Sequence, residues 1–543
     1  MNLKRMAALA ATAALALTTA ACGSGGDNES GDSGATGGSN YVTLNGTEPQ
    51  SLLIPSATNE VGGGRIIDMV FAGLVYYDEK GEAHNEIAES IDANGDSTKF
   101  DIKLKKGLKF SDDTEVKADN FIKAWNDAGK LSNARLSGAF MEPIKGYSDK
   151  EDSELTGLKK VDDYHFTVEL NQPTADFPLR LGYSAFAPLP DSAFDNDGKV
   201  TDEFGENPVG YGPYKMKEEG AWEHNVQATL VPNPNYQGDR KPQNDGLVYK
   251  FYTKMNAAYA DVLADNLDVL DAVDESAFAT YEQDVAGRFS NKPVATSQSF
   301  SIPYIEHFQD DEEGRLRRQA ISMAIDRDEI TSTVFHKTRT PAKDFSAPVI
   351  NGYTDKLKGN EVLQFNPEKA KELWQKADEI AKFSGTFEIA YNADGGHQGW
   401  ADAVSNSIKN TLGINAQGKS YPDFKSLRTE ITDRTIKTAF RTGWQADYPG
   451  LSNFLTPIFK TNGSANDVDY SNPEFDKLLN EGDSATSVDD ANQKYQQAEE
   501  ILLQELPSIP TWYDNSVGAW STNVDNVVFN WQGVPEAYKI VKK

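Results

Sequence analysis

The chain has 543 residues, too many for a single hydrophobic core, so at least two lobes are expected. Its formal charge of −30 excludes the basic footprint that nucleic-acid binding needs, and it suits a soluble protein kept from aggregating outside the cell. The one cysteine, Cys22, excludes a disulfide framework.

The first 22 residues have the pattern of an export leader. Met1–Arg5 is a charged start, and Met6–Ala21 is an Ala/Leu/Thr run that is short for a transmembrane helix. Thr19–Gly23 (TAACG) resembles a bacterial lipobox, with Thr19 in place of the usual leucine. That resemblance implies a signal peptide over residues 1–21, cleavage before Cys22 and lipidation of this cysteine. A plain secretory signal with an accidental cysteine is the alternative.

Residues 23–40 consist almost entirely of Gly, Ser, Asp, Asn, Thr and Ala, so with Cys22 they are expected to form a flexible linker. Hydrophobic periodicity then predicts alternating strands and helices in the first half of the chain. These are a strand at Tyr41–Asn45, a helix at Ile66–Leu74, a strand at Phe100–Leu104, a helix at Asp119–Ala128, and strands at Phe166–Leu170 and Leu247–Tyr252.

The second half is predicted to be richer in helices, several with clear start signals such as Asn-Pro. They are a long helix at Glu313–Phe335, a helix starting at Asn366-Pro367, a strand at Thr386–Tyr391, a helix at Trp400–Leu412 ended by Gly413, a helix capped by Asn472-Pro473, a helix at Asn492–Leu506 and an extended end at Ser508–Tyr513. The fold class expected from this mixture is α/β.

The most informative stretch runs from Ile436 to Trp444, where residues alternate as in a half-buried strand. Arg441 and Asp447 lie six residues apart, or roughly 20 Å in an extended chain. Their side chains leave a gap of about 10 Å, near the span of three extended residues. Gly443 between them presents bare backbone. This arrangement predicts a cradle for a short zwitterionic peptide; the alternative is that both charges are solvated or form an internal salt bridge.

Several motifs, taken together and in order, resemble the oligopeptide- and dipeptide-binding lipoproteins among the extracellular solute-binding proteins (family 5) of ABC importers. The motifs are Glu48–Leu52 (EPQSL), Phe71–Leu74 (FAGL), Ala88–Ser90 (AES), Leu104–Asp112 (LKKGLKFSD), Gly210–Tyr214 (GYGPY), Asn233–Tyr236 (NPNY), Arg317–Ala320 (RRQA), Ala324–Arg327 (AIDR), Gly443–Tyr448 (GWQADY) and Tyr538–Lys542 (YKIVK).

This resemblance implies a bilobal, periplasmic-binding-protein-like (Venus-flytrap) α/β fold with an extra α/β domain inserted in the first lobe. Lobe I would comprise residues 41–72, 205–298 and 514–543, the extra domain 73–204, and lobe II 299–513. The protein would be a monomer that captures short peptides between its lobes, closes about a hinge, and delivers them to an ABC permease driven by its ATPase. No cofactor and no nucleic acid are expected.

The resemblance also assigns roles to particular residues. Asp447 would pair with the α-amine of the peptide, Arg441 with the carboxylate of short peptides, and His397 with that of longer ones. The peptide backbone would pair with Gly443 and Gln445 as an added strand. The segment Asn59, Glu60 and Val61 would supply the opposite edge.

Two departures from the family pattern bear on pocket size. Pro449–Leu451 lacks the acidic residue that relatives often carry before the proline, and Leu52–Pro55 (LLIP) lacks the aspartate of the usual Leu-Asp-Pro. Side-chain pockets could be lined by Trp444, Tyr421 and Tyr513, each of which also fits a core role.

Other functions fit the sequence less well than peptide binding. No H-E-x-x-H motif or Cys/His cluster indicates a metal site, and no G-x-S-x-G elbow indicates a hydrolase, so a secreted enzyme is disfavoured. Relatives of the fold that bind oligosaccharides, nickel complexes or haem remain an alternative, as does an adhesion or sensory lipoprotein. Asp447 and Arg441 together favour a zwitterion over a sugar.

Overall fold

Twelve strands form the main sheet of the protein, whose computed structural model describes residues 40–58, 60–422 and 424–543. The strands are β1 (Tyr41–Gly46), β8 (Tyr214–Met216), β9 (Trp222–Glu223), β10 (Gln227–Pro232), β11 (Gly246–Phe251), β12 (Val269–Leu270), β13 (Phe289–Ser301), β14 (Arg339–Pro341), β15 (Thr386–Asn392), β16 (Asn415–Tyr421), β17 (Ala439–Gln445) and β18 (Ser508–Trp520). Their order is β16-β15-β17-β13-β18-β12-β1-β11-β10-β8, with β14 beside β18 and β9 beside β10.

Smaller sheets complete the β structure. A four-stranded antiparallel sheet contains β4 (Ala88–Ala93), β5 (Lys99–Leu104), β6 (Leu158–Asp162) and β7 (His165–Glu169). A hairpin is formed by β2 (Val75–Tyr77) and β3 (Ala83–Asn85). A short C-terminal pair is formed by β19 (Val524–Asp525) and β20 (Val541–Lys542).

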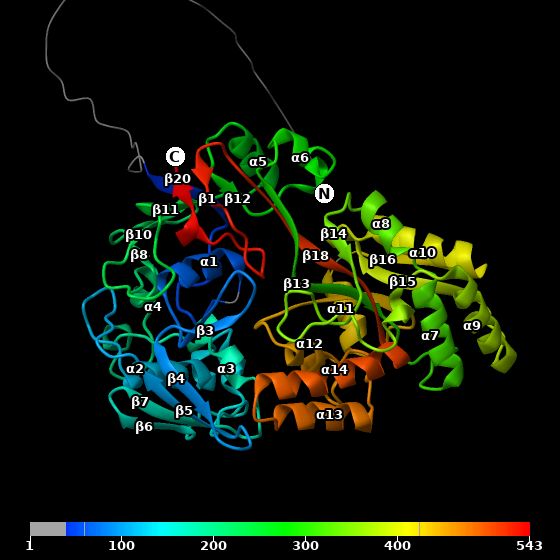
Figure 1. Ribbon diagram of the computed structural model, residues 1–543, viewed down its shortest axis with the longest axis horizontal. Helices are drawn as coiled ribbons and strands as arrows, with labels where there is room; N and C mark the ends of the chain where they lie inside the picture. The colour runs from blue at the N-terminus through cyan, green and yellow to red at the C-terminus, as the bar shows by residue number, and fades with distance from the viewer. Residues whose placement is uncertain (1–39, 59, 423) are drawn as a thin grey trace, which may run out of the picture. The chain divides into compact units, whose positions relative to one another are not determined.

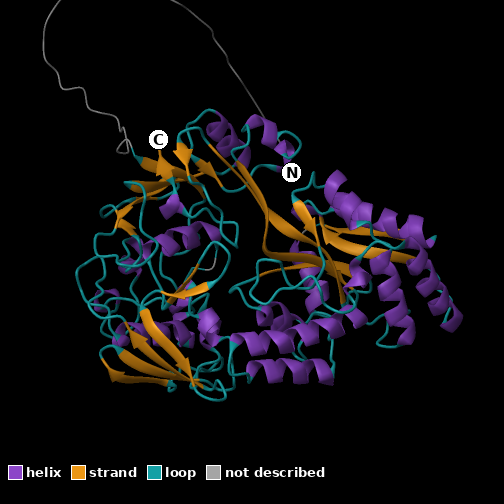
Figure 2. Ribbon diagram, viewed as in Figure 1, coloured by secondary structure: helices purple, strands orange, loops and turns teal. Residues whose placement is uncertain are grey.

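Helices lie beside these sheets, with α10 against β15 and β16, and α13 against α14 (Figure 2). They are α1 (Val61–Val70), α2 (Ala118–Gly129), α3 (Phe177–Arg180), α4 (Asp202–Glu206), α5 (Met255–Leu263), α6 (Tyr281–Asp284), α7 (Glu312–Met323), α8 (Arg327–Thr333), α9 (Pro367–Ile380), α10 (Gln398–Leu412), α11 (Phe424–Thr432), α12 (Leu451–Phe459), α13 (Pro473–Asp483) and α14 (Val488–Glu505). No helix in the described part of the chain is long and apolar enough to span a bilayer.

Buried apolar side chains gather into two large clusters and a smaller third one. The first draws on residues 42–249 and 524–540, and the second mainly on residues 295–513. The third joins residues 258–285 to β18. The predicted α/β class is confirmed, while the predicted domain boundaries stay a prediction.

The long strands β13 and β18 lie side by side and connect the second large cluster to the third (Figure 1). Residues 289–293 of β13 pair with 515–519 of β18, and residues 297–301 pair with 508–513. The ladder is interrupted between them, where Ala295 instead accepts a hydrogen bond from Ala446 (2.8 Å) and donates one to the carbonyl of Trp531 (2.9 Å). Two segments from distant parts of the chain are thereby fixed at the junction.

Most predicted elements are confirmed within a few residues. Strand β5, helix α2 and helix α10 match the predicted ranges, and Gly413 ends α10 with a φ of 73°. Asn472 caps α13 through bonds to the backbone of Glu474 and Phe475.

The single long helix predicted at Glu313–Phe335 is wrong. Helix α7 stops at Met323, and Asp326 caps a new helix, α8, by accepting a hydrogen bond from the Glu329 amide (2.9 Å). The break turns Arg327 into the core, where its guanidinium donates to the carbonyls of Leu363 (2.7 Å) and Pro510 (2.9 Å). A buried arginine needs such acceptors, and an uninterrupted amphipathic helix would not have supplied them.

The helix predicted at Ile66–Leu74 is also displaced. Helix α1 begins at Val61 and ends at Val70, because Phe71 is already extended, with φ −115° and ψ 157°. The first turn contains three consecutive glycines, Gly62–Gly64, which have no apolar side chain to show a helical period and are poor helix formers, so the predicted helix began too late.

Candidate functional site

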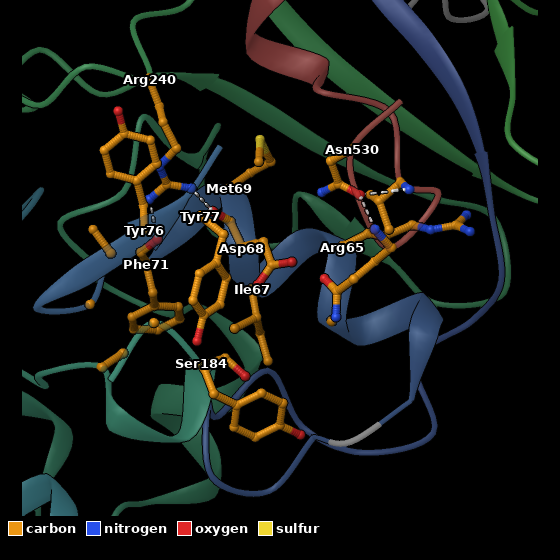
Figure 3. A pocket seen from close by; sticks show the side chains of 18 of the residues that line it. Arg65, Ile67, Asp68, Met69, Phe71, Tyr76, Tyr77, Ser184, Arg240 and Asn530 are labelled. Atoms are coloured by element: carbon orange, nitrogen blue, oxygen red, sulfur yellow. Dashed lines mark hydrogen bonds between the residues drawn. The ribbon is translucent and has the colours of Figure 1, made fainter. Parts of the chain in front are cut away.

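A cavity of about 330 Å³ lies where α1, the β2 hairpin and the end of β17 meet (Figure 3). Segments far apart in the chain form its wall: residues 60–77, 182–187, 445–447 and 530–538, together with Glu86, Arg240 and Tyr249. The main-chain bonds of Ala295 to Ala446 and Trp531 hold two of these segments together.

Helix α1 forms one wall, and its first turn is held tightly. Glu60 accepts hydrogen bonds from the amides of Gly62 (2.7 Å) and Gly63 (2.8 Å), which would otherwise be unpaired at the helix start. A Cβ on Gly62 would lie 2.5 Å from Oγ1 of Thr47, and one on Gly63 would lie 2.6 Å from Cγ2 of Thr58. The glycines therefore let the helix approach the chain before it.

Two arginines in the cavity wall are neutralised by the protein itself. Arg65 forms an ion pair with the buried Asp271, and its burial lowers the pKa of the guanidinium to about 10. Arg240 pairs with Glu86 through Nε and Nη2 (both 3.1 Å). Neither arginine leaves an uncompensated positive charge for a ligand.

Asp447 is at the cavity, at the turn between β17 and α12, as the sequence predicts for a binding residue. Asn453, in the first turn of α12, donates to Oδ2 of Asp447 (3.1 Å) and accepts from its amide (3.2 Å). Burial raises the pKa of the Asp447 carboxyl, while the hydrogen bond from Asn453 opposes this effect. No cation of the described chain forms an ion pair with it.

Gln445 also lines the cavity, while Gly443 and Trp444 lie just before it on β17. The indole of Trp444 donates to Oδ1 of Asn453 (2.9 Å), so it helps to fix the Asn453 side chain, which also bonds to Asp447. A Cβ on Gly443 would meet Oε1 of Gln298 at 2.6 Å.

One edge of β17 is paired with β13 along its whole length from Phe440 to Gln445. On the other edge, β15 pairs only with Ala439 and Phe440. Within the described ranges, residues 442–445 thus have no strand on that second edge, which is the geometry that strand addition by a peptide requires.

Besides Gly443 and Trp444, four further predicted site residues lie outside the lining of this cavity. Arg441 lies with its guanidinium 5.7 Å from the ring centre of Phe424. His397 accepts a hydrogen bond at Nδ1 from the indole of Trp400 (3.1 Å). Tyr421 is buried and donates to Glu430 (2.6 Å).

The fourth, Tyr513, is 1% exposed in the second apolar cluster. Its hydroxyl accepts from the amides of Lys343 (3.1 Å) and Asp344 (2.9 Å), so it has the core role that the sequence left open.

The predicted segment at residues 59–61 is only partly described. Asn59 and Cys22 lie outside the described residues. Glu60 and Val61 do line the cavity, but as the cap and first residue of α1 rather than as a paired strand.

Sequence reasoning missed most of the cavity wall. Among the missed polar and aromatic residues are Arg65, Asp68, Tyr76, Tyr77, Tyr183, Arg240, Asn530 and Gln532. Arg65 and Asp68 lie on the polar side of a helix with buried Ile66, Ile67 and Met69, a signal that was readable once the helix was placed correctly. For Arg240 and Asn530 no local signal existed.

One group in the described chain has side chains close enough to share a metal ion. Asp78, Glu82 and His84, at the β2–β3 hairpin, have ligand atoms within 4.8 Å of one another. They are not part of the cavity lining, and Nε2 of His84 lies 3.2 Å from Asp78 in a hydrogen bond.

Comparison with known protein families gives one match that spans most of the chain. A model described as the middle region of bacterial extracellular solute-binding proteins, family 5, matches residues 82–466.

Individual relatives match over nearly their whole length. The chain is 27% identical over 542 residues to the oligopeptide-binding protein OppA of Bacillus subtilis, covering 95% of each chain. It is 27% identical over 468 residues to the periplasmic murein peptide-binding protein MppA of Escherichia coli, covering 82% of this chain and 83% of that one.

Solved structures share the fold. The unliganded open form of the murein tripeptide-binding protein MppA superposes with a TM-score of 0.80 at 23% identity, covering 92% of this chain and 97% of the other. OppA of Haemophilus influenzae in complex with the peptide RPPGFSPFR gives a TM-score of 0.67 at 22% identity, covering 92% and 98%. The predicted bilobal binding-protein fold is thereby confirmed.

Proposed function

Because the chain belongs to the bacterial extracellular solute-binding proteins of family 5, we propose that it captures short peptides for an ABC importer and passes them to the membrane permease. Relatives named for oligopeptide, dipeptide and murein peptide binding support this choice of ligand. The single observation that carries it is Asp447, a carboxylate placed at the cavity and without a cationic partner in the described chain.

Asp447 is the anchor for the α-amine of the peptide. Its raised pKa reports a carboxylate that has lost water without gaining a positive charge. A ligand ammonium supplies that charge, and truncating one partner of such a buried pair costs roughly 2–5 kcal/mol. The edge of β17 at residues 442–445 accepts the peptide backbone, which gives affinity without reading side chains.

Arg441 and His397 are proposed to bind the carboxylate of shorter and longer peptides. Both lie outside the present cavity lining, so this role requires the lobes to move when ligand binds. The predicted boundaries 298/299 and 513/514 fall inside the long paired strands β13 and β18, which supports a hinge there.

The remaining parts of the proposal concern the setting of the protein. The mature chain is a monomer tethered to the membrane by lipid on Cys22, with residues 23–40 as a spacer, and its role is binding rather than catalysis. An ATPase coupled to the permease drives release of the ligand.

A thermal-shift and calorimetric screen of purified protein against di- to hexapeptides tests the proposal. A peptide at one hundred times its dissociation constant is expected to stabilise the fold by about 2.7 kcal/mol. N-acetylated copies of the same peptides, and the variant Asp447→Ala, should lose most of this effect. The variant Asp149→Ala, which removes an exposed carboxylate away from the cavity, should keep it.

Two results would count against the proposal. Equal stabilisation by acetylated and free peptides would remove Asp447 as the amine anchor. Stabilisation by oligosaccharides and by no peptide would remove peptides as the ligand class.

A further inference from the structure

Asp68 presents a second carboxylate to the cavity. It lies in the last full turn of α1, with its side chain exposed while the neighbouring Ile67 and Met69 are buried. Figure 3 shows this carboxylate in the middle of the cavity, between Tyr77 and Arg65. Among the described residues, no hydrogen-bond donor and no ion-pair partner reaches its oxygens.

The other charges of the cavity wall are already compensated. The Glu60 carboxylate accepts hydrogen bonds from the backbone amides of Gly62 and Gly63, and Arg65 forms an ion pair with Asp271.

The remaining pairs lie deeper in the wall. Glu86 is paired with Arg240, and Glu536 lies 3.3 Å from the ammonium of Lys539. Among the described residues of the lining, Asp68 is the one carboxylate with neither a hydrogen bond nor an ion pair to its side chain, while Asp447 has the bond from Asn453 and no ion-pair partner.

The surroundings of Asp68 penalise its negative charge. Although the side chain opens onto the cavity, desolvation by the surrounding walls raises the pKa of its carboxyl to about 6, and the nearby charge of Arg240 acts in the opposite direction. Arg240 cannot serve as its partner, because Glu86 holds the guanidinium and the Arg240 Nη1 bond goes to the main-chain carbonyl of Asp68 (2.8 Å). A positive group from outside the protein would remove the penalty.

The walls around Asp68 suit a long side chain that ends in a cation. Met69, Tyr76 and Tyr77 line the same cavity and offer apolar surface to an alkyl stem. Tyrosine rings also attract cations over their faces.

Resting on the proposed function, we infer that Asp68 binds the cationic side chain of a lysine or arginine in the peptide whose α-amine is held by Asp447. The cavity thereby selects peptides that carry a second positive charge, in addition to capturing peptides in general.

Calorimetric titration of the full chain with matched tripeptides tests the inference. A lysine is moved through the first, second and third positions of an alanine tripeptide, and each peptide is compared with its norleucine counterpart, which has a similar stem and no charge. At one position lysine is expected to bind at least tenfold more tightly than norleucine. Asp68→Asn should abolish this ratio and leave the affinity for norleucine peptides within about twofold, whereas Asp149→Asn should retain the ratio.

The outcomes separate this inference from the proposed function. If neutral tripeptides bind and lysine gives no advantage at any position, the Asp68 subsite is wrong while peptide capture stands. If the lysine advantage persists in Asp68→Asn, another residue supplies it and the inference is also wrong. If no tripeptide binds at all, both proposals fail. Should Asp68→Asn not fold, Asp68→Ser replaces it, and the wild-type advantage of lysine must also fall at 1 M salt, where charges are screened within about 3 Å.

Discussion

The side chain of Asn453 donates from Nδ2 to Oδ2 of Asp447 over 3.1 Å, and its Oδ1 accepts from the amide of the same aspartate over 3.2 Å. A third bond, from the indole of Trp444 (2.9 Å), shares that oxygen. Asn453 is 4% exposed, so water cannot readily replace it. One buried amide therefore sets the position of the carboxylate at the cavity.

Replacement of Asn453 by alanine is expected to weaken peptide binding about tenfold, equivalent to roughly 1.4 kcal/mol. Asp447 loses its fixed orientation, and the Trp444 indole loses its acceptor. Calorimetry measures the affinity, and tryptophan fluorescence reports the indole. Trp444→Phe, which keeps both bonds between Asn453 and Asp447, should bind more nearly like the wild type. Unchanged affinity in Asn453→Ala would contradict this account.

The proposed carboxylate role of Arg441 can be tested with amidated peptides. For di- and tripeptides, C-terminal amidation should weaken binding at least tenfold, because the half-buried guanidinium of Arg441 would lose the ligand's anion. Arg441→Ala should lose affinity for the free acids and show little difference between acid and amide. If the variant still prefers the free acid by the original ratio, Arg441 is not the anchor.

Asp176 is expected to be a major contributor to stability. It is 2% exposed, accepts from Nη2 of Arg180 (3.0 Å) and receives the hydroxyl of Ser452 from α12. Arg180 in turn lies 5.0 Å from the ring centre of Tyr448.

Asp176→Ala leaves that arginine without its anion, so we expect a loss of about 3–5 kcal/mol in the free energy of unfolding. Urea denaturation of wild type and variant measures this loss in the free energy of unfolding. Asp119→Ala, which removes an exposed partner of Lys160, is the control and should change stability little. Equal effects of the two substitutions would refute a structural role for the Asp176 network.

Two acids buried together make the stability depend on pH. Asp344 and Glu499 are both fully buried, and burial raises the pKa of each, that of Glu499 from 4.5 to about 7. The nearby charge of Glu499 raises the pKa of Asp344 further.

Between pH 4.5 and 7 the folded chain thus holds more protons than the unfolded chain, so stability must fall as pH rises through this range. The contribution of Glu499 is fully present below pH 4.5 and is lost as pH rises through about 7. Urea titrations at pH 5, 6, 7 and 8 follow the decline, and Glu499→Gln should flatten it. A profile unaffected by that substitution would exclude the pair as its cause.

The sequence predicts those parts of the site that depend on local pattern. The alternation before Trp444 gives the strand β17, and the family motif gives Asp447, because both signals are contained in a dozen consecutive residues. The break between α7 and α8 was missed because the apolar spacing continues across it, and what decides it is a bond from Arg327 to Pro510, far along the chain.

The cavity wall was harder to predict for the same reason. Arg240 pairs with Glu86, 154 positions away in the sequence. Asn530 lines the same cavity as α1, although the two are separated by most of the chain. Such neighbours are set by tertiary packing, which a single sequence does not display.

The shared strands β13 and β18 have a consequence for how the protein unfolds. Two separate cores in a long chain ordinarily melt in separate steps. Here one half of β13 and β18 supplies Ala295, Phe300, Ile509, Trp512 and Tyr513 to the second large cluster, and the other half supplies Val517 and Ala519 to the third, so the loss of one cluster frays the strands that the other needs. Because the same two continuous strands run through both clusters, we expect these clusters to melt together as one cooperative unit.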